Sequence, residues 1–290
     1  MTEMKSRRAV TFGLSAVAVA SVLGLPRMAA AEAPRYPWLA GSPGSLETIG
    51  KRFAVPSGFE RVSARPGSFA AWLRGLPLKP AGAKVYLHDK RLKPNQGVHA
   101  AVVDLDVGRR DLQQCADAVM RLRAEYLYSK RRFRSIAFNY TSGDRAAFGR
   151  WADGWRPRIV GRRVRWARKG QRGTGYRNFR SYLISVFTYA GSYSLSRELK
   201  RVPASQDIRI GDVFVQGGFP GHAVIVVDMA VNRRTGQKLF LLAQSYMPAQ
   251  NLHVLKNVHE PKLGAWFALP DGDRLSTPEW TFKLEHLRRF

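Results

Sequence analysis

One histidine stands at the start of a strand-forming run, where its ring could act as a general base. His222 follows the glycine-containing residues 217–221 and precedes the apolar, β-branched residues 223–227. A rigid sheet would hold one end of the imidazole and leave the other exposed, which suits a general base. Gln244 ends the next predicted strand and could hydrogen-bond the ring and fix its tautomer. A histidine that merely caps a strand is the alternative, and the residues alone leave both open.

The single cysteine of the chain, Cys115, supplies a candidate nucleophile. It falls in the first turn of a predicted helix, where aligned backbone N–H groups lower the pKa of a thiol. With the histidine and the glutamine it would complete a Cys-His-polar triad for amide hydrolysis. It also lies on the apolar stripe between Leu112 and Val119, where a small buried hydrophobic side chain belongs. Ser142 is a weaker candidate, because ordinary turn chemistry explains it.

Helices and strands must position these groups. Asp111 is the expected N-cap of a helix over residues 111–129, which has apolar residues at i, i+3, i+4 and i+7. The same spacing predicts a helix over 176–189, and shorter helices are expected at 69–73 and 145–151. Apolar alternation or continuous apolar runs predict strands at residues 98–107, 135–140, 212–215, 223–229, 239–244 and 252–255. This order predicts an α+β fold with helices packed on a small antiparallel sheet.

The N-terminal residues 1–31 have the three parts of a cleavable export signal. Lys5, Arg7 and Arg8 form a charged start, residues 10–25 are apolar, and residues 29–31 offer an A-x-A cleavage site. The arginine pair resembles a twin-arginine signal, but the full consensus is absent, so Sec export stays open. An N-terminal membrane anchor is the remaining alternative.

The rest of the chain divides into a predicted linker at 32–45 and a single domain at 46–290. No further apolar run reaches the roughly 20 residues of a membrane-spanning helix. We therefore expect a mature chain without a transmembrane segment, located in the periplasm or outside the cell. One cysteine and scattered histidines predict no metal site and no cofactor. The sequence does not indicate an oligomeric state.

The chain is strongly basic, with 48 Lys and Arg against 21 Asp and Glu and a formal net charge of +27. Such a charge favours anionic partners, such as a phosphorylated wall polymer or lipopolysaccharide, and no motif favours nucleic acid. Basic residues concentrate in a predicted loop at 150–180, where the candidates for binding an anionic envelope polymer are Arg162, Arg163, Arg165 and Arg168. A solvated, arginine-rich surface loop is the alternative interpretation.

Three segments resemble an uncharacterised domain-of-unknown-function family of exported bacterial proteins. They are WLRGLPL at 72–78, DLQQCADAVMRLRAEY at 111–126 and AQSYMPAQ at 243–250. This resemblance implies an extracytoplasmic location and a shared fold, and it supplies no known activity.

Residues 176–255 resemble the catalytic half of papain-like bacterial wall peptidases of the NlpC and CHAP type. The similarity lies in a helix, IGDVF at 210–214, PGHAVIVV at 220–227, a hairpin and a polar strand end. It implies a papain-like fold in which His222 is the base and Gln244 the residue that orients it. The cysteine of those enzymes begins the preceding helix, and the matching position here holds Phe179.

Two functions follow from these patterns. The first is a papain-like cysteine hydrolase of peptidoglycan or another envelope amide, with Cys115 attacking, His222 as base and Gln244 orienting the base. The second is a non-catalytic papain-like module that binds an anionic envelope polymer through the arginine-rich segment. Phe179 at the usual cysteine position favours the second function, and the placement of His222 and Gln244 favours the first.

Overall fold

The computed structural model of the chain describes residues 1–2, 36–39, 47–161 and 163–290. The chain divides into the units Met1–Ala31 and Glu32–Phe290, and every element described below belongs to the second unit. The predicted export signal lies outside the described residues, apart from Met1 and Thr2, as does most of the predicted linker. In the described part of the chain, no helix is long and apolar enough to cross a membrane.

Two long strands form the centre of a nine-stranded sheet. β9 (His222–Val231) pairs antiparallel with β10 (Lys238–Gln244). Every residue of β9 except Val231 is buried, which explains its nearly continuous apolar sequence, because a strand covered on both faces has no solvent side. The other strands of this sheet are β1 (Glu60–Arg61), β2 (His99–Val102), β7 (Lys200–Arg201), β8 (Val213–Gln216), β11 (His253–Leu255), β12 (Trp266–Ala268) and β15 (Leu287–Arg289).

The sheet has the order β2-β11-β10-β9-β8-β15-β7, with β1 beside β9 and β12 beside β10. All of these neighbours run antiparallel. The predicted α+β class with an antiparallel sheet is therefore confirmed, and the strands expected near 212–215, 223–229, 239–244 and 252–255 are β8, β9, β10 and β11. The strand expected at 98–107 is shorter and ends at Val102.

The two faces of the sheet contact two apolar cores, because successive side chains of a strand point to opposite faces. Ala223, Ile225 and Val227 belong to the core that contains the helices. Val224 and Val226 belong to the second core, which is covered by the hairpin of β13 (Arg274–Ser276) and β14 (Thr281–Lys283).

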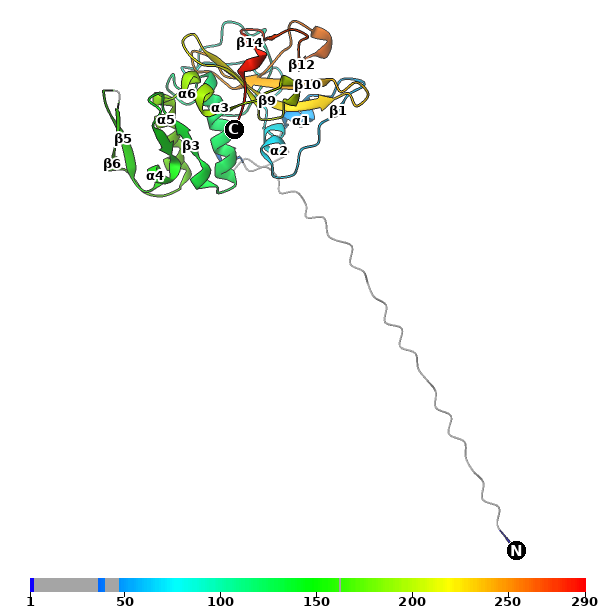
Figure 1. Cartoon of the computed structure of the whole chain (residues 1–290), viewed down its shortest axis with the longest axis horizontal. Helices are drawn as coiled ribbons and strands as arrows, with labels where there is room; N and C mark the ends of the chain where they lie inside the picture. The colour runs from blue at the N-terminus through cyan, green and yellow to red at the C-terminus, as the bar shows by residue number, and fades with distance from the viewer. Residues whose placement is uncertain (3–35, 40–46, 162) are drawn as a thin grey trace. The chain divides into compact units, whose positions relative to one another are not determined.

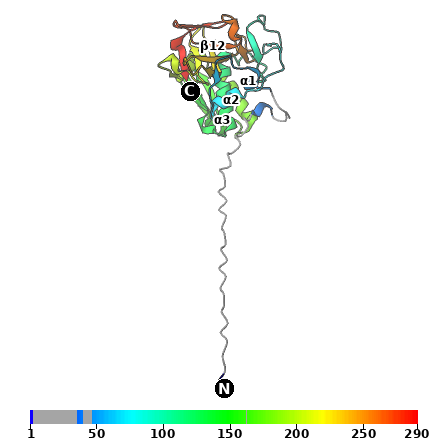
Figure 2. The same ribbon diagram turned by 90° about the vertical axis from the view of Figure 1, so that its right-hand side faces the viewer.

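Helices cover the first core. They are α1 (Ile49–Arg52), α2 (Phe69–Arg74), α3 (Cys115–Ser129), α4 (Phe148–Ala152), α5 (Tyr176–Tyr189) and α6 (Ser192–Glu198). α2 and α3 pack on β9, and both lie beside it in Figure 1. Figure 2 shows α1, α2 and α3 from the side. Single 3-10 turns are η1 (Pro37–Leu39), η2 (Phe133–Ser135), η3 (Ser205–Asp207), η4 (Pro261–Leu263) and η5 (Leu284–His286).

The helix expected over residues 111–129 begins later than predicted. Gln114 is its N-cap, and the Gln114 and Asp117 side chains each bond to the other's backbone N–H in a capping box. Asp111 instead accepts hydrogen bonds from the Gln114 side chain and from the backbone N–H of Ala249. The expected N-cap, Asp111, is therefore engaged in a long-range hydrogen bond with Ala249, and the helix starts at Cys115.

The arginine-rich segment, expected to be a loop, is a β-hairpin of β5 (Trp155–Val160) and β6 (Arg163–Arg168). It extends from the helical side of the domain, at the left of Figure 1. In β6, residues 163–166 alternate between arginine and an apolar residue, and the aromatic and β-branched residues of both strands favour a hairpin despite the charge. A second hairpin joins β3 (Ala137–Asn139) to β4 (Arg145–Ala147), so only the end of the helix expected at 145–151 is helical.

One buried carboxylate fixes the edge of the helical layer to the central strand. Asp228 of β9 is fully buried and pairs with Arg61 of β1 and with Arg74 of α2, whose Nε lies 2.7 Å from the carboxylate. Burial raises the pKa of Asp228, and the two arginines lower it. The pairing matters because an ionised carboxylate without partners is costly inside a protein.

Replacement of both arginines, Arg61→Ala with Arg74→Ala, should lower the free energy of unfolding by about 3–5 kcal/mol, because it leaves a buried charge uncompensated. Urea denaturation followed by circular dichroism measures this change. Arg233→Ala is the matched control, since the Arg233–Glu60 pair is exposed on both sides and should contribute little. If the double variant and Arg233→Ala lowered the free energy of unfolding equally, the buried Asp228 would not depend on its two arginine partners.

Candidate active site

The Cys115 thiol sits at the N-terminus of α3 and lines a surface pocket. The first N–H groups of a helix have no acceptor within the helix, so the N–H groups of Cys115 and Ala116 are free to face the sulfur. Hydrogen bonds from both, and from the backbone of Ala223, favour the thiolate. Burial acts in the opposite direction and, with a smaller contribution from Asp117, raises the pKa of Cys115 to about 11.

The contact with Ala223 brings the cysteine to the start of β9. Ala223 directly follows His222, the first residue of that strand. Packing of α3 on β9 therefore places the thiol against the backbone beside the candidate base. Gly221 precedes His222 in the turn that leads into β9. A Cβ atom at Gly221 would lie 2.5 Å from the Gly218 carbonyl oxygen, so only glycine fits this turn.

The His222 side chain is only 2 % exposed. The rings of Tyr246, Trp280 and Phe282 surround it, with centroids 4.7, 5.3 and 5.8 Å from that of the imidazole. The expectation of an exposed ring was therefore wrong. The covering side chains come from segments after β10, and no pattern near His222 could have indicated them.

A hydrogen bond between His222 and Gln244 holds the buried ring. His222 Nε2 lies 2.8 Å from Gln244 Oε1, at the end of β10. Gln244 Nε2 in turn donates to Glu279 Oε2 at 2.8 Å, and the other Glu279 oxygen accepts from Lys93 Nζ at 2.5 Å. Lys93 is itself 5 % exposed. Four polar side chains thus form one continuous buried network.

This network determines which nitrogen of His222 carries the proton. The Glu279 carboxylate paired with Lys93 accepts hydrogen bonds, so the NH₂ group of Gln244 must face it. Gln244 Oε1 then faces His222 and can only accept, which places a proton on Nε2 and leaves the Nδ1 lone pair free. The histidine thus has the tautomer in which Nδ1 can accept a proton.

A second buried histidine is consistent with this arrangement. His253 Nδ1 lies 2.8 Å from the carbonyl oxygen of Asn251, and its Nε2 lies 3.4 Å from Gln244 Nε2. Nδ1 must donate to the carbonyl, so His253 Nε2 is an acceptor for the second Gln244 hydrogen. Burial lowers the pKa of His253 to about 3. His253 is thus a neutral part of the support around Gln244.

The Cys115 thiol and the His222 imidazole are both uncharged near neutral pH. Burial lowers the pKa of His222 to about 4, Lys93 lowers it further, and the Gln244 hydrogen bond acts in the opposite direction. The Cys115 pKa of about 11 keeps the thiol protonated.

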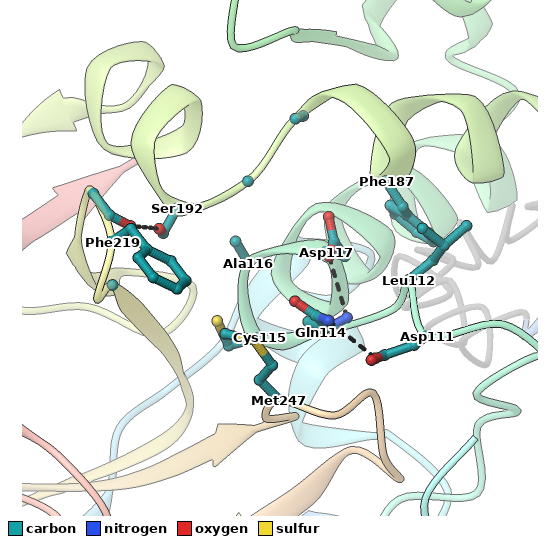
Figure 3. A pocket seen from close by; sticks show the side chains of 14 residues that line it. Asp111, Leu112, Gln114, Cys115, Ala116, Asp117, Phe187, Ser192, Phe219 and Met247 are labelled. Atoms are coloured by element: carbon teal, nitrogen blue, oxygen red, sulfur yellow. Dashed lines mark hydrogen bonds between the residues drawn. The ribbon is translucent and has the colours of Figure 1, made fainter. Parts of the chain in front are cut away.

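The pocket beside Cys115 has a volume of about 330 Å³. Figure 3 shows the Cys115 sulfur between the Phe219 ring and Met247, with Ser192 beside Phe219 and Asp117 on the other side. The Phe219 side chain is 94 % exposed, and Ser192 Oγ donates to the Gly218 carbonyl oxygen at 3.2 Å. Cys115 itself is only 8 % exposed, and His222 does not line this pocket.

Cys115 contacts the backbone of Ala223, next to His222, and His222 is hydrogen-bonded to Gln244. The His222 ring, however, packs on Trp280 and Phe282 of the second core, and neither His222 nor Gln244 lines the pocket beside Cys115. Phe179 is a core residue that stacks on Tyr128 at 4.4 Å, and the helix that meets the start of β9 is α3, not α5. Ser142 lies on the β3–β4 turn and donates to Asp144. Sequence reasoning missed Lys93 and Glu279, which lie outside regular elements and have no local signal.

The arginine candidates lie elsewhere. Arg162 is outside the described residues, and Arg163, Arg165 and Arg168 are exposed on β6. None of these three lines the pocket beside Cys115. Within the described residues, no group of three or more His, Cys, Asp or Glu side chains could hold a metal ion.

The rate of Cys115 alkylation by iodoacetamide should rise about tenfold per pH unit between about pH 7 and about pH 9, because the raised pKa keeps the thiolate a minor species there. Mass spectrometry of the native protein measures the rate. Denatured protein is the control and should level off near the ordinary thiol pKa. A native rate that is already constant at about pH 7 would mean a thiol–imidazole ion pair and would contradict the raised pKa.

Comparison with known proteins gives one match. A family model described as domain of unknown function (4846) matches residues 49–289, a segment that contains Cys115, His222, Gln244 and Glu279. No curated protein and no solved structure matches the chain. The resemblance to an uncharacterised family, drawn from three sequence segments, is confirmed. Because the match spans most of the chain, this protein belongs to the domain of unknown function 4846 family.

Proposed function

We propose that this protein is an exported, papain-like cysteine hydrolase that cleaves an amide bond of peptidoglycan or of another envelope component. The main support for this proposal is the position of the Cys115 thiol at the start of α3, in contact with the backbone of Ala223. The neighbouring residue, His222, has its ring hydrogen-bonded to Gln244. A nucleophile, a base and a residue that orients the base are the parts that such a hydrolase needs.

The connectivity supports the papain-like assignment. The nucleophile begins a helix, the base begins the strand on which that helix packs, and the orienting residue ends the next strand. This is the order that the resemblance of residues 176–255 implied, with α3 in place of α5 as the source of the cysteine. Export is supported by the signal pattern of residues 1–31.

The proposed reaction starts from the two neutral groups. As the Cys115 sulfur attacks the amide carbonyl carbon, His222 Nδ1 takes the thiol proton, and the carbonyl oxygen becomes an oxyanion. The imidazolium then gives this proton to the leaving amine, the carbon–nitrogen bond breaks, and a thioester remains on the sulfur. Water, with its proton taken by the same imidazole, hydrolyses the thioester and restores the thiol.

The N-terminus of α3 supplies groups that can stabilise the oxyanion. The N–H groups of Cys115 and Ala116 lie in the first turn, have no helical acceptor and are fixed by the capping box of Gln114 and Asp117. Fixed backbone donors at the position where negative charge develops are a main source of catalysis in acyl transfer. They also offset the burial that disfavours the thiolate.

Purified protein should release new amino groups from isolated peptidoglycan, and His222→Ala should lower this rate about 10²–10⁴-fold, because the base is removed. Cys115→Ala should abolish the reaction, since it removes the proposed nucleophile. Mass spectrometry of the released fragments identifies the bond that is cut. Ser142→Ala is the control and should retain full activity, because Ser142 lies on the β3–β4 turn. Full activity of Cys115→Ala would overturn the proposed mechanism.

A second proposed role, binding of an anionic envelope polymer, is favoured by the β5–β6 hairpin. Arg158 and Arg165 stand directly opposite each other, and Arg163 lies on the same face. All three are exposed, and within the described residues none forms an ion pair with a carboxylate. Like charges in a cross-strand pair repel each other, and a bound polyanion would relieve that repulsion.

Arg165→Glu should weaken binding of labelled polyphosphate, a soluble phosphate-rich probe, because it removes one cation and neutralises Arg158 across the strand. The hairpin should stay folded, since opposite charges now face each other. Anisotropy titrations at increasing NaCl concentration measure the loss. Arg234→Glu, which makes the same charge change in the exposed β9–β10 turn, should have a smaller effect. Equal effects of both variants would mean that net charge alone attracts the polymer.

A further inference from the structure

The pocket beside Cys115 is acidic, although the chain as a whole is strongly basic. Asp111 and Asp117 line it, and the described residues that line it include no lysine, arginine or histidine. Asp111 is exposed at the rim, whereas Asp117 is 5 % exposed. In a chain with 48 basic and 21 acidic residues, this local reversal of sign calls for a physical explanation.

One oxygen of Asp117 has no partner. Oδ2 accepts from the backbone N–H of Gln114 at 3.1 Å, which completes the capping box, while Oδ1 is buried without a hydrogen bond. Figure 3 shows the carboxyl with one oxygen on this bond and the other turned toward the chain that leads to Ser192. Buried polar atoms of native proteins almost always have a partner, so the unpaired oxygen points to a ligand group.

The ligand group that fits this oxygen is a cation with N–H donors. The capping function needs only one carboxylate oxygen, so it leaves the free oxygen unexplained. Burial raises the pKa of Asp117 well above its ordinary value, and backbone hydrogen bonds lower it. A bound ammonium group would supply both the missing charge and the missing hydrogen bond.

The apolar side of the pocket suits the same group. The ring of Phe219 lines the pocket and is almost fully exposed, so its face is accessible to a ligand. Aromatic faces attract ammonium ions, and the interaction strengthens where water is excluded. A carboxylate on one side and an aromatic ring on the other are therefore complementary to one protonated amine.

We infer that this pocket is a substrate subsite for a protonated primary amine, held by Asp117 and flanked by Phe219. This inference rests on the proposed function and gives it a substrate class: an amide whose neighbouring residue carries a free amino group. Because the subsite adjoins the Cys115 sulfur, the amine would lie close to the bond that is cut. Acetylation of the amine would remove both its charge and its fit to Asp117.

Three methanethiosulfonates that differ only in charge test the subsite without knowledge of the substrate. The aminoethyl reagent is a cation, the methyl reagent is neutral and the sulfonatoethyl reagent is an anion. Each forms a mixed disulfide with the Cys115 thiolate and releases methanesulfinate, and mass spectrometry gives the rates. After correction by rates on denatured protein, the cation should react at least about tenfold faster than the anion. The basic surface of the protein would favour the opposite order.

Asp117→Asn should reduce this cation-to-anion ratio at least about fivefold, because an amide cannot ionise beside a bound cation, while it keeps an oxygen for the Gln114 N–H. The ratio cancels any change in the pKa of the thiol itself. Asp153→Asn, the same change at an exposed residue outside the pocket, should keep the wild-type ratio. Where Asp117→Asn does not fold, the wild-type ratio decides the question by itself.

The outcomes separate this subsite from the proposed function. Reaction of Cys115 with the neutral reagent but no preference for the cation would overturn the subsite and leave the hydrolase standing. A cation preference that survives Asp117→Asn would also overturn it. Cys115 that reacts with none of the three reagents would contradict the hydrolase and, with it, the subsite.

Discussion

The candidate site depends on one hydrogen bond, from His222 Nε2 to Gln244 Oε1. It lies in the protein interior, where a polar atom without a partner costs more than a hydrogen bond contributes on its own. Gln244 cannot turn its amide, because Glu279 and His253 both need its NH₂ group. The ring of His222 therefore keeps one orientation and one tautomer, and Nδ1 remains the nitrogen that can take a proton.

The same burial that fixes the ring also keeps it uncharged. Desolvation moves the pKa of His222 down to about 4 and that of Cys115 up to about 11, so an ion pair at rest is disfavoured on both sides. The free N–H groups at the start of α3 act against this effect only near the sulfur and the oxyanion that would form beside it. In the proposed hydrolysis, charge separation would therefore be favoured in the transition state more than at rest.

The sequence predicted the parts of this site whose signals are local. The apolar run of β9 and its hairpin partner put His222 and Gln244 at the same sheet edge, because an antiparallel return strand ends where the first begins. The start of α3 could not be predicted, since Asp111 is used by distant Ala249. Glu279 and Lys93 reach Gln244 only through tertiary folding. In the β5–β6 hairpin, Trp155 and Trp166 lie among arginines, and the dense charge led to the prediction of a loop instead of strands.

A basic surface and an acidic pocket can coexist because they act over different distances. At physiological salt, exposed charges are screened beyond about 8 Å, so the hairpin arginines attract a polyanion without governing the pocket. Asp117 acts in direct contact and with little water around it, where the attraction for a cation is far stronger per charge. The hairpin and the pocket therefore differ both in the sign of the charge they present and in the distance over which that charge acts.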